Sequence, residues 1–558
     1  MGANLNLTIW QDEKDYVKWN KISDAVEYIL YDDNSNIAMI KFAANEKREY
    51  KPTVVGKHNL KLVAVLKDGK QIKANFKTKE VKMICSYHTW PRSDFRFSEK
   101  QIGFTGLDTS LLEKEGDRYI AYYNIDKGWT HKKEEQTDFN QDAYISEFFK
   151  NYKAAGMNVL NPFVTAIIRS DVQWETSYLK KVMDKAWYEY GLKMCVLDQS
   201  FFEIPTQHEW SREQVKEEIE RLLNIEGGAI KGYMHHPGFY GINILDEPMC
   251  SKAKDATCIN HIQTAGYCCS VLAEIAKREN IECNFSCSLL RYPYMFRGVK
   301  GYKEYLEYWV EYSQADFINF DVYLPSVLDN EIRGCEVTSE DFQMTWKCVR
   351  EVASKHKLKI DAATTAFDFT NGFTYRKVNK RDVLQNVYYA LAHESNSLMY
   401  FVAFPFVDDG SIIRTIFGFD TKPTEIYGWV KTANENSLVF RSSLQGYKYQ
   451  KSNAIDNEAL QTIKILWKKN NNEYAHLYMN MNSSIDNIPS LVFVYDGEEY
   501  LYFKQNGKYE RKVSKGESAV WIMPGELLIV FNDKKDILDR ATLGNSNKAC
   551  ETLKPHEL

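Results

Sequence analysis

The sequence lacks any apolar run long enough to cross a membrane, which takes about 20 consecutive residues. Its 11 cysteines are odd in number and scattered, with no spacing typical of a zinc site or a secreted disulfide framework. We therefore expect reduced, inert thiols, no metal and no cofactor. The formal net charge of -5 excludes the electrostatic attraction that binds nucleic acid or an anionic membrane, so neither is an expected partner.

The N-terminus also lacks a signal-peptide pattern. The sequence as it stands therefore predicts a cytoplasmic protein. A secreted or cell-surface protein is the alternative if a signal peptide has been removed.

A chain of 558 residues is too long for a single hydrophobic core, so two to four domains are expected. Residues 1–83 read as short strands, with Asp68-Gly69 as a hairpin turn. Residues 84–435 alternate buried strands with amphipathic helices. Residues 436–540 return to short strands, the first expected at 438–440, and residues 541–558 read as a charged tail.

The first segment resembles a fibronectin type III module. Residues 19–28 are similar to the early strands of such a module, and residues 60–68 are similar to a later one. The resemblance implies a β-sandwich at the N-terminal end. The strand pattern of residues 436–540 indicates a second β-sandwich.

The central segment contains eight expected strands separated by helices. Over 210–225, Val215, Ile219 and Leu222 recur at helical spacing. Alternating strands and helices predict parallel βα units, and eight of them predict an α/β fold, the (β/α)8 TIM barrel. A doubly wound open sheet is the alternative, disfavoured because no glycine-rich phosphate loop follows the first strand. The expected strands are 119–125, 158–163, 192–197, 240–245, 281–287, 316–320, 358–363 and 398–403.

Asp246-Glu247-Pro248 is the most informative motif, because it directly follows the apolar run 240–245. Two adjacent carboxylates after a buried strand are costly unless they are paired or used. Proline then ends the strand. The sequence therefore predicts an acidic pair at the mouth of the barrel, where barrel enzymes carry their active sites.

The other strand ends are rich in amides, carboxylates and aromatics and poor in His and Cys. Such a set suits hydroxyl-rich ligands, because amides and carboxylates bond hydroxyl groups and aromatic faces stack on sugar rings. We therefore expect an oligosaccharide or other glycan as the substrate. The candidate substrate-binding residues are Tyr123, Asn161, Asp198, Gln199, Arg291, Asp321, Tyr323 and Tyr400.

The acid pair with proline after the fourth strand looks like the motif of clan A glycoside hydrolases, which are built on this barrel. The runs 236–241, 399–401 and 423–427 strengthen the match. The resemblance implies that Glu247 is the general acid/base. The chain departs from clan A at Asp246, where asparagine is usual, and at the seventh strand, 358–368, which contains no Glu where the nucleophile is expected.

One resemblance covers both departures. Some glycosidases use the 2-acetamido oxygen of the substrate as the nucleophile. The β-N-acetylhexosaminidases and the family 123 β-N-acetylgalactosaminidases look like this chain in carrying an Asp-Glu pair at the fourth strand. The resemblance implies that Asp246 stabilises the acetamido group, that Glu247 protonates the leaving oxygen, and that Tyr323 can donate to the acetamido oxygen.

Three alternatives stay open. The chain can be a two-carboxylate retaining hydrolase with an unidentified nucleophile, for which Asp368 qualifies only if its strand runs further than expected. It can be a carbohydrate-binding protein on a degenerate barrel. It can also be a barrel enzyme with non-glycosidic chemistry, because fold alone does not fix chemistry.

Overall fold

The structure is a computed structural model. It describes residues 7–12, 15–33, 39–88, 94–97, 99–124, 127–136, 142–162, 168–248, 261–292, 298–323, 339–370, 375–408, 411–455, 462–469, 473–481, 489–533 and 541–542.

The centre of the molecule is a ring of eight parallel strands, which confirms the predicted barrel. The strands are hydrogen-bonded in the order β16-β15-β14-β13-β8-β21-β18-β17. A parallel bridge between Leu289 and Phe320 joins the two ends of this order. In chain order the strands are β8 (Ile84–His88), β13 (Val159–Pro162), β14 (Lys193–Val196), β15 (Phe239–Asp246), β16 (Asn284–Ser288), β17 (Phe317–Asp321), β18 (Lys359–Thr365) and β21 (Ser395–Phe401).

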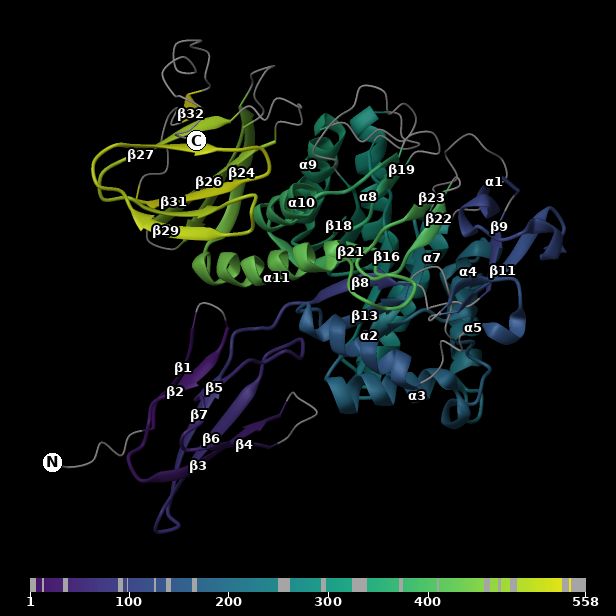
Figure 1. The fold of residues 1–558 in the computed structure, drawn as a ribbon, viewed down its shortest axis with the longest axis horizontal. Coiled ribbons are helices and arrows are strands. Elements are labelled where there is room, and N and C mark those ends of the chain that lie inside the picture. The colour runs from purple at the N-terminus through teal and green to yellow at the C-terminus, as the bar shows by residue number, and fades with distance from the viewer. Residues whose placement is uncertain are drawn as a thin grey trace.

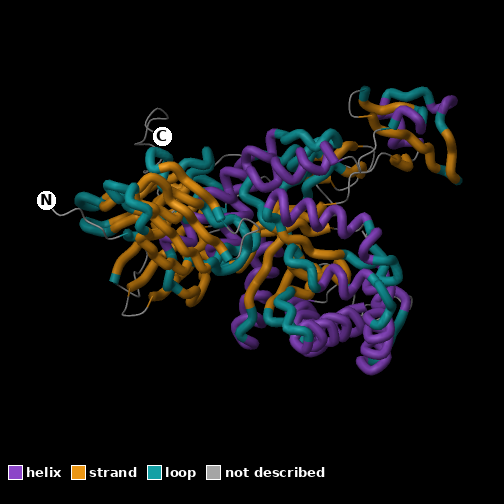
Figure 2. The backbone as a smooth tube through the Cα atoms, turned by 90° about the horizontal axis from the view of Figure 1, so that it is seen from below, coloured by secondary structure: helices purple, strands orange, loops and turns teal. Residues whose placement is uncertain are grey.

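Helices cover the outside of this ring (Figures 1 and 2). The predicted helix over 210–225 is α5, which runs from Arg212 to Leu223 and buries Val215, Ile219 and Leu222. A capping box of Ser211 and Gln214 starts it. The larger helices of the barrel are α2 (Asp142–Ala154), α3 (Tyr178–Asp184), α4 (Gln199–Gln207), α5, α7 (His261–Arg278), α8 (Gly298–Ser313), α9 (Ser339–His356), α10 (Lys380–Ala392) and α11 (Glu425–Ser443).

The prediction for the first barrel strand was wrong. Residues 119–125 overlap β11 (Arg118–Asn124), which pairs antiparallel with β9 (Asp94–Phe97), β10 (Glu113–Glu115) and β12 (Gly128–Thr130). This small sheet has a core of its own, which includes Phe97, Tyr119 and Ala121. The first barrel strand is β8 instead, so β15 remains the fourth strand.

The N-terminal segment forms two antiparallel sheets around one core that contains Trp19, Tyr28 and Leu62. One sheet has the order β1 (Ile9–Gln11), β2 (Val17–Trp19), β5 (Glu49–Tyr50). The other has the order β4 (Ile40–Ala43), β3 (Ala25–Asp32), β6 (Asn59–Leu66), β7 (Gln71–Lys77). The two sheets fit the expected sandwich. Its relation to fibronectin type III modules stays a prediction.

The C-terminal segment also forms two sheets. The six-stranded sheet has the order β24 (Lys448–Ile455), β25 (Thr462–Lys469), β26 (Glu473–Asn480), β31 (Leu527–Asn532), β28 (Glu499–Phe503), β29 (Tyr509–Val513). The other has the order β30 (Ser518–Ile522), β27 (Ser490–Val494), β32 (Ala541–Thr542). Two expectations need correction, because residues 438–440 belong to α11 and β32 lies in the segment expected to be a tail.

The six-stranded sheet packs one face on the barrel helices. Ile463, Ile465 and Leu477 belong to the same apolar core as the barrel strands. The Trp467 indole donates to the carbonyl of Ala392, at the end of α10, at 2.9 Å. Within the described residues, no helix is both long and apolar enough to span a membrane.

Gly241 of β15 lies close to the backbone of β16. A Cβ built on it would lie 2.0 Å from the backbone carbonyl oxygen of Asn284, which cannot move without breaking the strand pair. We expect Gly241→Ala to lower the free energy of unfolding by about 1–3 kcal/mol, the usual cost of overpacking. Urea unfolding followed by circular dichroism measures the change.

The matched control is Gly301→Ala in α8, where a Cβ would meet no atom within 4 Å. There the helix propensity of alanine should raise the stability by about 0.5–1 kcal/mol. Equal effects of the two substitutions would contradict the close strand approach.

Candidate active site

The alternation of side chains places Asp246 on the inside of the barrel. In the β15–β16 register, Asp246 is opposite Ser288 and Leu245 is opposite Cys287. Leu245 and Cys287 belong to the apolar layer under the helices. The intervening positions therefore face inward, and Asp246 and Ser288 do so at the carboxyl ends of their strands.

Asp321 ends β17 and faces the same space. Its register partner on β18 is Ala363. Ala363 packs inside the barrel with Cys85, Val159 and Met399. Asp321 is therefore an inward carboxylate on the sixth strand.

Three carboxyl groups influence one another at this end of the barrel. Burial and the charge of Glu247 raise the pKa of Asp246 to about 8. Burial, with the charges of Glu247 and Asp246, raises the pKa of Asp321 well above its usual range. Burial also raises the pKa of Glu247, although a hydrogen bond with Asp321 and the charge of Arg291 act in the opposite direction. The cluster therefore holds protons at a pH where ordinary carboxyl groups are ionised.

The backbone of Glu247 is in an unusual conformation, with φ at 46°. This left-handed region is disfavoured for a non-glycine residue and persists only when its surroundings hold it. The Glu247 N–H donates to the carbonyl of Ser288 at 2.8 Å. The Tyr305 hydroxyl donates to the carbonyl of Pro248 at 2.8 Å and accepts from the Leu290 N–H at 3.2 Å. The fifth strand and α8 thus hold the acidic turn.

Several inward oxygens are buried and have no hydrogen-bond partner among the described residues. They come from the second, fourth, fifth, sixth and seventh strands, and they are Asn161 Oδ1, Asn243 Oδ1, Ser288 Oγ, Asp321 Oδ1 and Thr365 Oγ1. Buried polar atoms are normally bonded, so such a set is unusual. These oxygens can still accept hydrogen bonds, which suits a ligand with many hydroxyl groups.

Three aromatic side chains pack together at the same end of the barrel. The ring of Tyr323 lies 5.2 Å from that of Phe367 and 5.8 Å from that of Phe401. Tyr323 and Phe401 also pack against the apolar interior of the barrel. The structure therefore brings Tyr323, Asp321, Arg291 and Asn161 to the carboxyl end of the barrel, together with Asp246 and Glu247.

Two predicted substrate-binding residues lie elsewhere. Tyr400 is fully buried on the outward side of β21, and its hydroxyl donates to Asn434 Oδ1 of α11 at 2.7 Å. Met399 and Phe401, its neighbours on the strand, face inward instead. Tyr123 belongs to β11 of the small antiparallel sheet, where its ring packs on Trp129 and Phe419 at 5.0 and 5.4 Å.

Asp198 and Gln199 were also predicted to bind substrate, and the structure gives them local partners. Asp198 is buried and caps α4, accepting hydrogen bonds from the Ser200 N–H and from the hydroxyls of Ser170 and Tyr233. Burial raises its pKa to about 6. The Gln199 amide donates to Glu203 within the same helix at 3.1 Å. Both residues therefore stabilise the start of α4.

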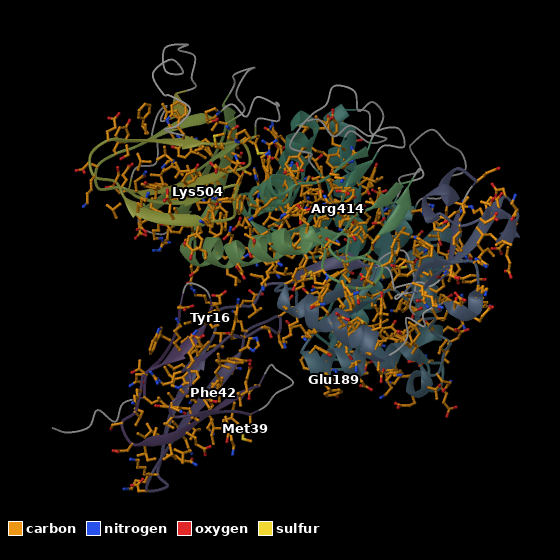
Figure 3. All side chains as sticks on the ribbon, viewed as in Figure 1. Tyr16, Met39, Phe42, Glu189, Arg414 and Lys504 are labelled. Carbon is orange, nitrogen blue, oxygen red and sulfur yellow. The ribbon has the colours of Figure 1, made fainter. Side chains whose placement is uncertain are left out.

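Asp368 does not resemble a nucleophile. It is fully buried, accepts the Val378 N–H at 2.8 Å, and forms an ion pair with Arg414 at 3.1 Å (Arg414 is labelled in Figure 3). A paired carboxylate of this kind ties loops together. Across the described ranges, no group of three His, Cys, Asp or Glu residues is arranged to hold a metal ion.

A scan against protein-family models finds no match, and a search of curated proteins finds no similar sequence. Solved structures of similar architecture include a family 39 glycoside hydrolase from Bacteroides cellulosilyticus, with a TM-score of 0.43 and 10% identity, over 94% of this chain and 100% of that one. They also include a GH99 endo-α-mannosidase from Bacteroides thetaiotaomicron, with a TM-score of 0.39 and 14% identity, over 65% of this chain and 98% of that one.

The raised pKa of Asp246 predicts a pH-dependent cost to folding. In the folded protein the Asp246 carboxyl group keeps its proton up to about pH 8, whereas an unfolded aspartate releases its proton at about pH 4. Between these values the folded state binds more protons, so the free energy of unfolding falls as the pH rises. Asp246→Asn removes this titration and should become more stable relative to the native chain from about pH 4 to about pH 8, by on the order of 2 kcal/mol.

Urea unfolding across that pH range measures the difference. Asp184→Asn is a control of opposite sign, because the hydrogen bonds of Asp184 with Lys180 and His236 lower its pKa against the effect of burial. A constant difference between Asp246→Asn and the native chain at every pH would contradict the buried acid cluster.

Proposed function

We propose that the protein is a glycoside hydrolase with Glu247 as its general acid/base. The observation that carries this proposal is the convergence of Glu247, Asp246 and Asp321 at the carboxyl end of the barrel, with pKa values raised mainly by burial. Cleavage of a glycosidic bond needs a proton on the leaving oxygen. A carboxylic acid supplies it best when its pKa lies near the working pH.

We further propose that the substrate supplies its own nucleophile. A two-carboxylate retaining mechanism needs the second carboxyl group about 5–5.5 Å away, across the scissile bond. On the seventh strand, Asp361 accepts a hydrogen bond from Asn396 near the amino end. Asp368, which follows this strand, is paired with Arg414. The 2-acetamido group of an N-acetylhexosaminide removes the need for such a residue.

In this mechanism the acetamido oxygen attacks C1 while Glu247 gives its proton to the departing oxygen. The C1–O bond breaks, and a cyclic oxazolinium ion forms. Glu247 then takes a proton from the water that attacks C1 and opens the ring. Asp246 accepts the acetamido N–H, which favours its ionised form and leaves the proton of the pair on Glu247. Tyr323 donates to the acetamido oxygen.

One observation favours a second candidate, a retaining hydrolase in which Asp321 is the nucleophile. Asp321 is a carboxylate from a different strand that interacts directly with Glu247. Two carboxyl groups joined by a hydrogen bond lie closer together than the roughly 5–5.5 Å that a retaining mechanism needs. This candidate therefore ranks second.

Hydrolysis of aryl β-glycosides tests the proposal. The protein should turn over N-acetylhexosaminides and leave plain hexosides intact. Glu247→Gln should lower kcat by about 10²–10⁴-fold on substrates whose leaving group needs protonation. Glu189→Gln, the same change on an exposed helical residue labelled in Figure 3, should leave kcat unchanged.

Asp246→Asn and Asp321→Asn separate the two mechanisms. Loss of activity on N-acetylhexosaminides in Asp246→Asn supports the acetamido mechanism. Turnover of plain hexosides that is lost in Asp321→Asn supports the second candidate. Sugar binding without turnover of any glycoside would contradict both and indicate a carbohydrate-binding protein.

A further inference from the structure

A cavity of about 830 Å³ lies at the opposite end of the barrel from the acidic cluster. Ile84, Asn158, Ile360 and Ser395, at or next to the amino ends of four barrel strands, line its floor. Helix α11 forms one wall, and another is formed by residues 15–16, 51–53 and 79–82, which lie between strands of the N-terminal segment or just after them. Tyr16, which also lines the cavity, lies at the end of the N-terminal sheets nearest α11 (Figure 3). The cavity is therefore bounded by separate parts of the chain.

The lining is strongly basic. Ten lysine and arginine side chains contribute to it, against four carboxylates. The basic residues are Lys51, Lys79, Lys82, Lys153, Arg350, Lys357, Lys359, Lys431, Arg441 and Lys448. This excess of positive charge stands out because the whole chain has a net charge of -5.

Arg441, near the end of α11, is a partly buried cation of this lining. Its Nη2 is buried without a hydrogen-bond partner in the described part of the chain. Burial lowers its pKa to about 10. No carboxylate of the described residues lies within ion-pair distance, which differs from the paired guanidinium of Arg414. A buried guanidinium without an anion is costly.

Lys153, at the end of α2, is a second cation of the lining that has no ion pair among the described residues. Burial lowers its pKa, and its ammonium group donates to the carbonyl of Tyr190 at 2.5 Å. Arg350 is paired with Glu394 at 3.4 Å, yet its Nε is buried without an acceptor in the described ranges. Unsatisfied donors thus come from two helices, α11 and α9, and α2 adds a lysine that has no carboxylate within ion-pair distance among the described residues.

Three of the four lining carboxylates already have cations of their own, and the fourth, Glu435, is exposed. Asp15 lies 3.7 Å from Lys79, and Glu80 lies 2.8 Å from Lys82. Glu394 is shared by Arg350 and Lys448. Arg441 and Lys153 therefore have no ion-pair partner among the described residues, although the charges of Asp15, Asp361 and Glu80 act on Arg441 from further away.

We propose that this cavity binds a small polyanion, with at least two phosphate, sulfate or carboxylate groups. Its volume is that of a small-molecule site, for which about 300–1,000 Å³ is usual. The fork of Arg441 binds one anionic group through paired hydrogen bonds, and Lys153 and Arg350 hold another. Tyr16 and Trp467 add aromatic surface, which accommodates a sugar that carries the charged groups.

Isothermal titration of the full chain with pyrophosphate, citrate and a disulfated disaccharide tests the site. At least one probe should bind with a Kd below about 1 mM, and more weakly at high salt because the attraction is screened. Arg441→Gln and Lys153→Gln should each raise that Kd by about tenfold or more. Lys216→Gln, an exposed change on α5, should leave it unchanged. The probe that binds tightest distinguishes a free anion from a charged sugar.

The site is independent of glycosidase activity, so Glu247→Gln should bind the probe as the native chain does. If near-ultraviolet circular dichroism shows that Arg441→Gln is unfolded, Lys153→Gln decides the outcome. Absence of binding for all three probes at millimolar concentration, or binding that neither cavity variant weakens, would overturn the proposal.

Discussion

The candidate site depends on the backbone pairing of Ser288 and Leu289, at the end of the fifth strand. The Ser288 carbonyl accepts the N–H of Glu247. Leu289 donates to the carbonyl of Asn319 at 2.9 Å and accepts the N–H of Asp321 at 3.3 Å. These two residues close the barrel and at the same time set the distance between the carboxylates of the fourth and sixth strands.

This constraint explains how three carboxyl groups can remain close together. Elsewhere in the barrel, buried carboxylates are bonded, as Asp368 is to Arg414 and Asp198 is to hydroxyl and N–H donors. At the mouth, burial raises three carboxyl pKa values, and the charge of Arg291 opposes this only for Glu247 and Asp321. Such a cluster opposes folding, and proteins tolerate this cost at sites that act on a ligand.

The sequence was sufficient to predict the barrel and the acidic pair. A buried run followed by Asp246-Glu247-Pro248 has few structural explanations, and helices such as α5 show clear periodicity. The first strand was missed because β8 carries polar residues, whereas β11 reads as an apolar strand. The pattern cannot show that β11 pairs antiparallel with strands close to it in sequence.

The direction of individual side chains was harder to predict. Register shifts on both sides of β15 change which residues face inward. Asn243 was therefore overlooked, although it is a polar residue inside an apolar run. Tyr400 was assigned to the wrong face of its strand for a similar reason. Asp198 shows another limit of prediction from the sequence. An aspartate that follows a strand can cap the next helix or bind substrate, and the sequence pattern is the same in both cases.

The most direct test of the account is the binding of an N-acetylhexosamine thiazoline, which mimics the cyclic intermediate of the acetamido mechanism. The account predicts that the thiazoline binds at least about 10²-fold more tightly than the parent N-acetylhexosamine, as expected for an analogue of a transition state or reactive intermediate. Equal affinity for the two compounds would contradict the role of Asp246 and, with it, the substrate-assisted mechanism.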